Sequence, residues 1–286
     1  MKDNNKAQDK SVKDMGDYFS SRLEVILKRL NEIRKEHPEI VLKDGAYDYS
    51  QAPPEVKAEI EKNLEDMAEI ELEEVLWHLA KYYYAKENNL PIDPSLAEFL
   101  LRKRENRFAI IPDSVIEDLL ERFPELKKVH PKIYERLGEK TVHYPSEQRD
   151  FVFKNVLADV LEPVFRKIEN FAKAGVKGVK AKKENGFYYI NYTNAAPEVK
   201  KVLDDTLEEY FRELFEFLIY HVSHYYFAIY NDPSRLDLHE GNIVIVAKSI
   251  GATFVPKIVI IDALKRFPEL RKMYPKIAKE YKKFLK

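Results

Sequence analysis

The chain of 286 residues contains no cysteine, only eight glycines and only three glutamines. Without cysteine it has no disulfide framework, no thiol nucleophile and no Cys-ligated zinc or iron–sulfur site. The sequence also lacks a P-loop, a dinucleotide-binding fingerprint and a nucleophile-elbow motif. Scarce glutamine beside a charged fraction of 34% favours a thermophilic source, although an AT-rich mesophilic genome gives a similar composition.

Long hydrophobic runs and excess charge are missing as well. The longest apolar stretch, residues 214–230, is shorter than the ~20 residues of a membrane span, and residues 1–14 lack the apolar core of a signal peptide. We therefore expect no membrane span and a cytoplasmic protein, or one of the host cytoplasm or virion if the source is viral. A net charge of −1 requires any basic surface to be local.

Two segments of the sequence occur twice. Residues 48–57 read DYSQAPPEVK, and residues 191–200 read NYTNAAPEVK, 143 positions later. RFPELKKVHPKI at 122–133 recurs as RFPELRKMYPKI at 266–277, 144 positions later. Two separate segments at nearly the same offset predict an internal duplication, which is the signature of tandem repeats.

We divide the chain into a polar segment, residues 1–13, repeat one, residues 14–141, and repeat two, residues 142–286. The predicted fold is α+β and predominantly α, with the repeats related by a pseudo-two-fold axis. Each repeat is expected to contain an amphipathic helix, a β-hairpin, a long spine helix, a short second hairpin and terminal helices broken by proline. The expected elements are helices 17–35 and 150–172, hairpin turns Asp44-Gly45 and Asn185-Gly186, spines 54–86 and 197–230, second hairpins 99–111 and 243–261, and a connector at 138–148.

The sequence after the second spine carries a possible catalytic motif. Residues 237–246 read DLHEGNIVIV, and residues 257–262 read KIVIID. This arrangement resembles the catalytic loop and metal-binding strand of the protein-kinase-like superfamily, in its aminoglycoside-phosphotransferase style. The resemblance implies that Asp237 is the base for the attacking hydroxyl and that Asn242 and Asp262 hold Mg²⁺ on ATP.

A second interpretation of this motif is open, in which Asp237 and Asn242 cap turns. The first half of the chain has no Gly-rich phosphate loop. Only repeat two carries the full pattern, because the counterparts of the three residues in repeat one are Asp93, Glu98 and Asp118. On this interpretation the protein has no cofactor, and Mg²⁺ and ATP enter only if the kinase-like interpretation holds.

Two further groups of side chains are candidates for binding. His221, His224 and His239 could share a metal ion, although the first two lie on the apolar second spine. Basic side chains gather at two predicted hairpins, where they could contact phosphate or a partner or could simply keep the tips soluble. These are Lys177, Lys180, Lys182, Lys183, Arg102, Arg104 and Arg107.

Duplicated helical modules without a shared catalytic set typically serve binding or assembly, as fused protomers of an ancestral dimer do. We therefore expect a non-enzymatic interaction or assembly protein of viral or mobile-element origin, with protein partners and a homo-oligomeric state. The alternatives are the ATP- and Mg²⁺-dependent phosphotransferase and a nucleic-acid-binding protein that uses the basic hairpins.

Overall fold

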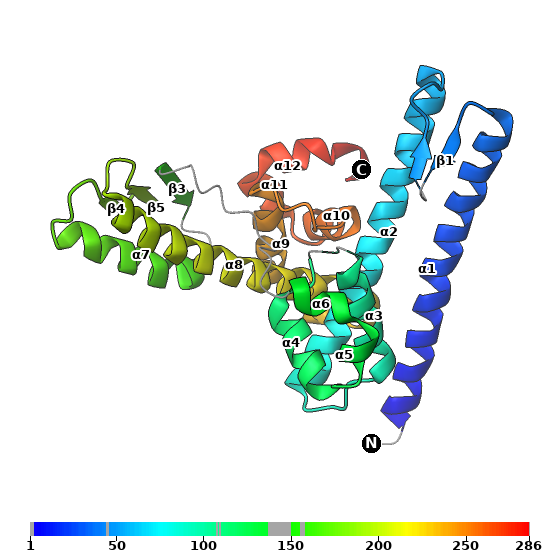
Figure 1. Cartoon of the computed structure of the whole chain (residues 1–286), viewed down its shortest axis with the longest axis horizontal. Helices are drawn as coiled ribbons and strands as arrows, with labels where there is room; N and C mark the ends of the chain where they lie inside the picture. The colour runs from blue at the N-terminus through cyan, green and yellow to red at the C-terminus, as the bar shows by residue number, and fades with distance from the viewer. Residues whose placement is uncertain are drawn as a thin grey trace. The chain divides into compact units, whose positions relative to one another are not determined.

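The computed structural model describes residues 3–43, 46–106, 108, 110–136, 150–154 and 158–285. The chain is predominantly α-helical with a small amount of antiparallel β-sheet, as the sequence predicts (Figure 1). It divides into two compact units, Met1–Val75 and Leu76–Lys286, which we call the N-terminal and C-terminal units. In the described part of the chain, no helix combines the length and apolarity that crossing a membrane requires.

The N-terminal unit is a helical hairpin with a β-ribbon at its turn. Helix α1 (Asp3–Glu36) runs alongside the first part of α2 (Pro54–Glu87), and strands β1 (Val41–Lys43) and β2 (Ala46–Asp48) pair between them (Figure 1). The polar segment at residues 1–13 was expected to precede the first helix, but α1 already begins at Asp3. The predicted Asp44-Gly45 turn lies outside the described residues.

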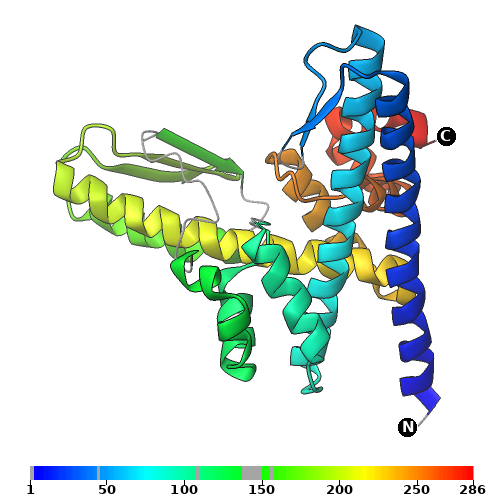
Figure 2. The same cartoon turned by 45° about the vertical axis from the view of Figure 1, so that its right-hand side comes forward.

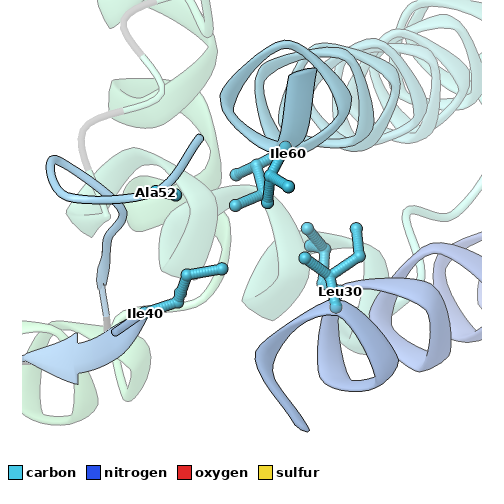
Figure 3. Packing of buried hydrophobic residues seen from close by; sticks show 6 residues of the cluster. Leu30, Ile40, Ala52 and Ile60 are labelled. Atoms are coloured by element: carbon cyan, nitrogen blue, oxygen red, sulfur yellow. The ribbon is translucent and has the colours of Figure 1, made fainter. Parts of the chain in front are cut away.

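Apolar side chains from the helices and the connection hold this unit together. The buried cluster lies where the ribbon meets the two helices (Figure 3), and its members are Leu30, Ile33, Ile40, Ala52, Val56 and Ile60. Arg22 donates to Glu73 at 2.7 Å, and Glu73 is itself buried, so the helix pair is also joined by an ion pair. The i, i+3 and i+4 spacing of the apolar residues predicts this packing.

The C-terminal unit contains the end of α2 and the second spine, α8 (Pro197–Asn231). Helix α7 (Ala158–Lys173) packs along the first half of α8, and a three-stranded sheet lies against them (Figure 2). The sheet order is β3 (Asp150–Lys154), β5 (Phe187–Asn191), β4 (Lys180–Glu184). The predicted Asn185-Gly186 turn is confirmed, because both residues have positive φ and Glu184 pairs with Phe187.

The range 150–172 was predicted as one helix, and this is wrong at its start. Residues 150–154 form β3, which pairs antiparallel with β5 from Asp150 opposite Asn191 to Lys154 opposite Phe187. The sequence DFVFK is rich in the aromatic and β-branched residues that favour strands. Helix α7 begins only at Ala158, so the sheet gains a third strand.

The second short hairpins were predicted incorrectly, because the described residues of both ranges form helices and connecting turns and no strand. In repeat one they are replaced by α3 (Pro94–Glu105) and α4 (Asp113–Arg122), and in repeat two by α9 (Leu238–Ser249) and α10 (Lys257–Arg266). Residues 243–247 of α9 are all buried, so the middle of this helix is enclosed on every side. A short, uniformly apolar run has no period that separates helix from strand.

Each predicted repeat ends in short helices that begin or break at proline, as predicted. Four of them have prolines at or before their first residue. They are α5 (Leu126–Val129), α6 (Pro131–Arg136), α11 (Pro268–Met273) and α12 (Pro275–Glu280), and η2 (Pro233–Arg235) and η3 (Lys282–Phe284) are single 3₁₀ turns. The boundary at residues 141 and 142 and the connector 138–148 lie outside the described residues.

The same hydrogen bonds occur at corresponding positions of the two predicted repeats. The Tyr82 hydroxyl donates to Asp118 at 2.9 Å, and Arg122 donates to the same carboxylate. In repeat two the contacts recur among Tyr225, Asp262 and Arg266. Recurrence of a three-residue network at the offset found in the sequence is what an internal duplication predicts.

Candidate functional site

Of the three residues of the kinase-like motif, Asn242 and Asp262 lie on helices and Asp237 caps one, and each makes a contact within the fold. Asp237 precedes α9 and accepts a hydrogen bond from the Glu240 amide at 2.9 Å, as a helix N-cap does. Asn242 accepts from the Tyr274 hydroxyl at 2.7 Å. The resemblance implies a loop followed by strands, whereas the structure has two helices here, and the catalytic roles stay predictions.

Asp262 lies on α10 between two donors. The Tyr225 hydroxyl donates to it at 2.8 Å, and Arg266 donates to both carboxylate oxygens at 3.0 Å. Burial and the Asp262 carboxylate together raise the pKa of Tyr225, so the phenol remains protonated and keeps donating. Asp118 has the same partners in repeat one, which lacks the rest of the motif.

The glycine of the DLHEGN motif has a packing role. A Cβ atom on Gly241 would lie 2.5 Å from a ring carbon of Phe267 and 3.2 Å from a methyl carbon of Leu270. The absence of a side chain therefore lets α9 approach α11 closely. The capping role of Asp237 and the packing role of Gly241 therefore explain two residues of the motif without a catalytic function.

The predicted histidine site does not gather enough ligands. Glu240 accepts from His221 Nδ1 at 3.0 Å, and His224 Nδ1 lies 3.9 Å from the same carboxylate. His239 is exposed. Among the described residues, no group of three or more histidine and acidic side chains could hold a metal ion.

Two lysines of the β4–β5 hairpin are paired within the hairpin and its supporting helix. Lys182 lies 2.6 Å from Glu184 and over the Tyr189 ring, and Lys183 lies 2.9 Å from Glu162. The Tyr188 hydroxyl, followed by Lys183, lowers the pKa of Glu162 to about 2. Lys182 is therefore paired within the hairpin, and Lys183 joins the sheet to α7.

The other two lysines, Lys177 and Lys180, are exposed, and the described residues offer them no ion pair.

The basic residues of repeat one divide in the same way. Arg104 is 8% exposed and lies 2.6 Å from Asp113, so it joins α3 to α4 and is removed from the predicted partner surface. Arg102 lies at the exposed end of α3, 6.0 Å from the Phe99 ring centre. Arg107 lies outside the described residues.

A stronger basic segment, which the sequence reasoning missed, ends the chain. Residues 257–286 contain ten Lys and Arg but only three Asp and Glu, whereas the corresponding residues 113–142 contain six and seven. Five lysines on this segment are exposed, and none of them makes an ion pair within the described ranges. They are Lys265, Lys272, Lys276, Lys279 and Lys282.

The neighbouring basic side chains of this segment are already engaged. Arg266 pairs with Asp262 on α10, and Lys283 lies over the Phe284 ring at 4.8 Å. The exposed apolar side chains Met273 and Phe284 lie on the same run of short helices. The signal that could have found this surface was a count of charge in each repeat separately, because the net charge of the whole chain hides it.

A pocket of about 220 Å³ lies in the C-terminal unit between the ends of α2 and α8. Its walls are aromatic, and acidic side chains lie among its lining residues. These residues include Tyr83, Tyr84, Tyr220, Phe227, Glu87 and Asp232. None of the residues predicted from the kinase-like motif lines it.

Comparison of the chain with protein-family models, curated proteins and solved structures finds no match. What the protein does must therefore be inferred from its own residues, and three features carry information: the repeated sequence segments, the basic C-terminal helices and the aromatic pocket.

Proposed function

We propose that the protein is a non-enzymatic interaction protein, built by internal duplication, and that its partner is nucleic acid bound through the basic C-terminal helices. The observation that carries this proposal is the set of five exposed lysines on residues 265–282 that have no acidic partner in the described part of the chain. Unpaired lysines on adjacent short helices suit a phosphodiester backbone, because each phosphate contact releases condensed counterions.

The difference in charge between the repeats indicates that the exposed lysines form a binding surface and do not serve solubility alone. The corresponding helices of repeat one carry slightly more acidic than basic residues, yet share the motif RFPEL and the proline breaks. The fold therefore does not require the extra lysines of repeat two. Their accumulation on one repeat alone is expected if a polyanionic partner binds there.

The proposal replaces the hairpins with the C-terminal helices as the main contact surface. Lys177 and Lys180 remain candidates for additional phosphate contacts, since both are exposed. Lys182 and Lys183 have acidic partners within 2.9 Å, so a phosphate would have to displace an existing ion pair. The phosphotransferase alternative rests on the motif alone.

The test is a charge reversal with a matched control in the other repeat. Lys272→Glu/Lys276→Glu alters the proposed surface, and Lys128→Glu/Lys132→Glu makes the same change at the corresponding positions of repeat one. Binding is measured by fluorescence anisotropy with labelled single-stranded DNA, double-stranded DNA and single-stranded RNA. We expect the first variant to bind at least about tenfold more weakly, and the control to bind within about twofold of the wild type.

The three probes separate the forms of nucleic acid, and heparin as competitor measures affinity for polyanions in general. Equal weakening by both double variants would overturn the assignment of the surface. Absence of binding to every probe at low salt would overturn the proposal and would leave the protein-partner and phosphotransferase interpretations. Thermal unfolding of both variants shows whether either change acts through the fold.

A further inference from the structure

The ends of the two spines contact each other through aromatic side chains that correspond between the repeats. Trp77 packs against Tyr226 with ring centres 6.4 Å apart, and Tyr83 packs against Tyr220 at 5.2 Å. At the offset of the duplication, Trp77 corresponds to Tyr220 and Tyr83 to Tyr226. The two contacts therefore join the same pair of corresponding positions, with the roles of α2 and α8 exchanged.

A third contact lies between residues that correspond to each other. Tyr84 and Phe227 stack with ring centres 6.4 Å apart and an interplanar angle of 24°. In an isologous interface, a residue on the two-fold axis contacts its own counterpart, and the contacts beside it occur in reciprocal pairs. The three aromatic contacts follow this pattern. The ends of α2 and α8 thus pack as two related surfaces, and their differences can be compared side by side.

One side of this contact is filled by the single tryptophan of the chain. Trp77 is 2% exposed, and its ring centre lies 4.7 Å from that of Phe227 and 6.2 Å from that of Tyr230. Together with Tyr226, these residues surround the indole. An aromatic bicycle is therefore the group that this arrangement accommodates.

On the other side, tyrosine replaces the tryptophan and the pocket opens. Tyr220 occupies the position of Trp77, and the counterparts of the residues around the indole are Tyr83, Tyr84 and Glu87. All four line the pocket of about 220 Å³. The pocket is thus the open counterpart of the site that the Trp77 indole fills.

We propose that this pocket binds a planar bicyclic nitrogen heterocycle, of the size of an indole or a purine, that carries hydrogen-bond donors. The tyrosine and phenylalanine rings offer faces for stacking. Glu87, which stands where the filled side has Tyr230, accepts the Tyr220 hydroxyl and can accept further donors from a ligand. A positive charge on the ligand would add attraction to both the carboxylate and the ring faces.

The remaining lining residues make the mouth polar. Asp232 and Arg235 pair with each other at 3.4 Å and are exposed, and His224 lies parallel to the Tyr220 ring. A heterocycle held between the rings could therefore carry a polar substituent that points to solvent. A free heterocycle and an unstacked base of a single-stranded nucleic acid share this chemistry, so the test must distinguish them.

The experiment is isothermal titration calorimetry with indole, tryptamine, adenosine and a short single-stranded oligo(dA). Tyr220→Trp gives repeat two the residue that fills the site in repeat one, so we expect binding of the small probes to weaken at least about tenfold. Glu87→Gln keeps the shape and removes the charge, and it should weaken tryptamine more than indole. Tyr230→Phe, on the filled side, is the control and should leave binding unchanged.

Trp77 provides a second readout that does not depend on calorimetry. It is the only tryptophan in the chain, and it packs on Phe227, which also lines the pocket. Adenosine bound in the pocket should therefore change the tryptophan emission of the wild type. The same titration of Glu87→Gln tests the pocket even if Tyr220→Trp should unfold.

Two results would overturn the inference. One is the absence of binding by every small probe at millimolar concentration, and the other is equal binding by wild type, Tyr220→Trp and Glu87→Gln. Binding of oligo(dA) alone, unchanged by Tyr220→Trp, would place that contact on the basic helices and count against the pocket. The inference does not depend on the nucleic-acid proposal, since indole and tryptamine carry no phosphate.

Discussion

At the scale of single residues, the most informative contacts are those that occur twice. Asp118 and Asp262 each accept a buried tyrosine hydroxyl and an arginine one helical turn along. Removing either carboxylate leaves a buried phenol without its acceptor. A role in the fold therefore explains Asp262 as well as it explains Asp118, which has no catalytic motif around it.

We predict that Asp262→Ala and Asp118→Ala each lower the free energy of unfolding by about 1–3 kcal/mol, the cost of an unsatisfied buried donor. Urea denaturation measures both values. Titration with ATP and Mg²⁺, followed by thermal shift, then tests the catalytic alternative. Stabilisation of the wild type that is lost in Asp262→Ala and kept in Asp118→Ala would contradict the structural interpretation and favour the phosphotransferase.

Glu162 provides a prediction on pH. The Tyr188 hydroxyl donates to it at 2.6 Å and Lys183 lies 2.9 Å away, and together they lower its pKa from 4.5 to about 2. Because the pKa is lower in the folded state, the stabilisation is present above about pH 4.5 and disappears as pH falls toward 2. We expect the difference in melting temperature between wild type and Glu162→Gln to shrink over this range.

The matched control for this prediction is Glu169→Gln, which removes the ion pair with Lys173 on the same helix. Its effect on the melting temperature shows what the loss of one ion pair on α7 contributes without the tyrosine contact. A wild-type and Glu162→Gln difference that stays constant from pH 6 down to about pH 3 would contradict the assigned cause.

At the scale of elements, the sequence predicts those helices and turns that have a clear hydrophobic period or a specific turn residue. The two spines, the Asn185-Gly186 turn and the proline-broken ends were predictable, since each depends on local geometry. The helices α3 and α9 were missed because their apolar runs suit a buried strand equally well. The decisive signal is the aspartate before each helix, Asp93 and Asp237, which caps its first turn. For Asp237 the sequence leaves both a capping and a catalytic interpretation open.

The capping role of Asp237 is testable by substitution. Asp237→Ala should cost about 1 kcal/mol of unfolding free energy, and Asp93→Ala a similar amount, because each aspartate accepts a backbone amide of the first turn. Asp237→Asn should cost much less, since asparagine caps as well as aspartate does. Chemical denaturation of the four proteins measures this, and equal losses for Asp237→Asn and Asp237→Ala would argue against the capping role.

At the scale of the whole molecule, the candidate sites come from differences between the two predicted repeats. Repeat one fills its side of the aromatic contact with Trp77, and repeat two leaves the pocket at Tyr220 open. Residues 257–286 at the end of repeat two are strongly basic, whereas the corresponding residues 113–142 of repeat one are near neutral. A formal net charge of −1 therefore describes neither half, and composition alone could not reveal either site.

The predicted homo-oligomer also belongs to this scale. The reciprocal contacts of α2 and α8 lie within one chain, so the predicted duplication by itself does not require a second chain. Light scattering coupled to size-exclusion chromatography measures the state directly. We keep the homo-oligomer as a prediction, and a monomer at micromolar concentration would contradict it.

The central claim is that the C-terminal lysines bind phosphates, and the salt dependence of nucleic-acid affinity tests it most directly. Dissociation constants are measured from low to moderate salt for the wild type, Lys272→Glu/Lys276→Glu and Lys128→Glu/Lys132→Glu. We predict that the slope of log Kd against log salt decreases by about one for each lysine in the first variant and is unchanged in the second. Identical slopes for all three proteins would contradict the claim.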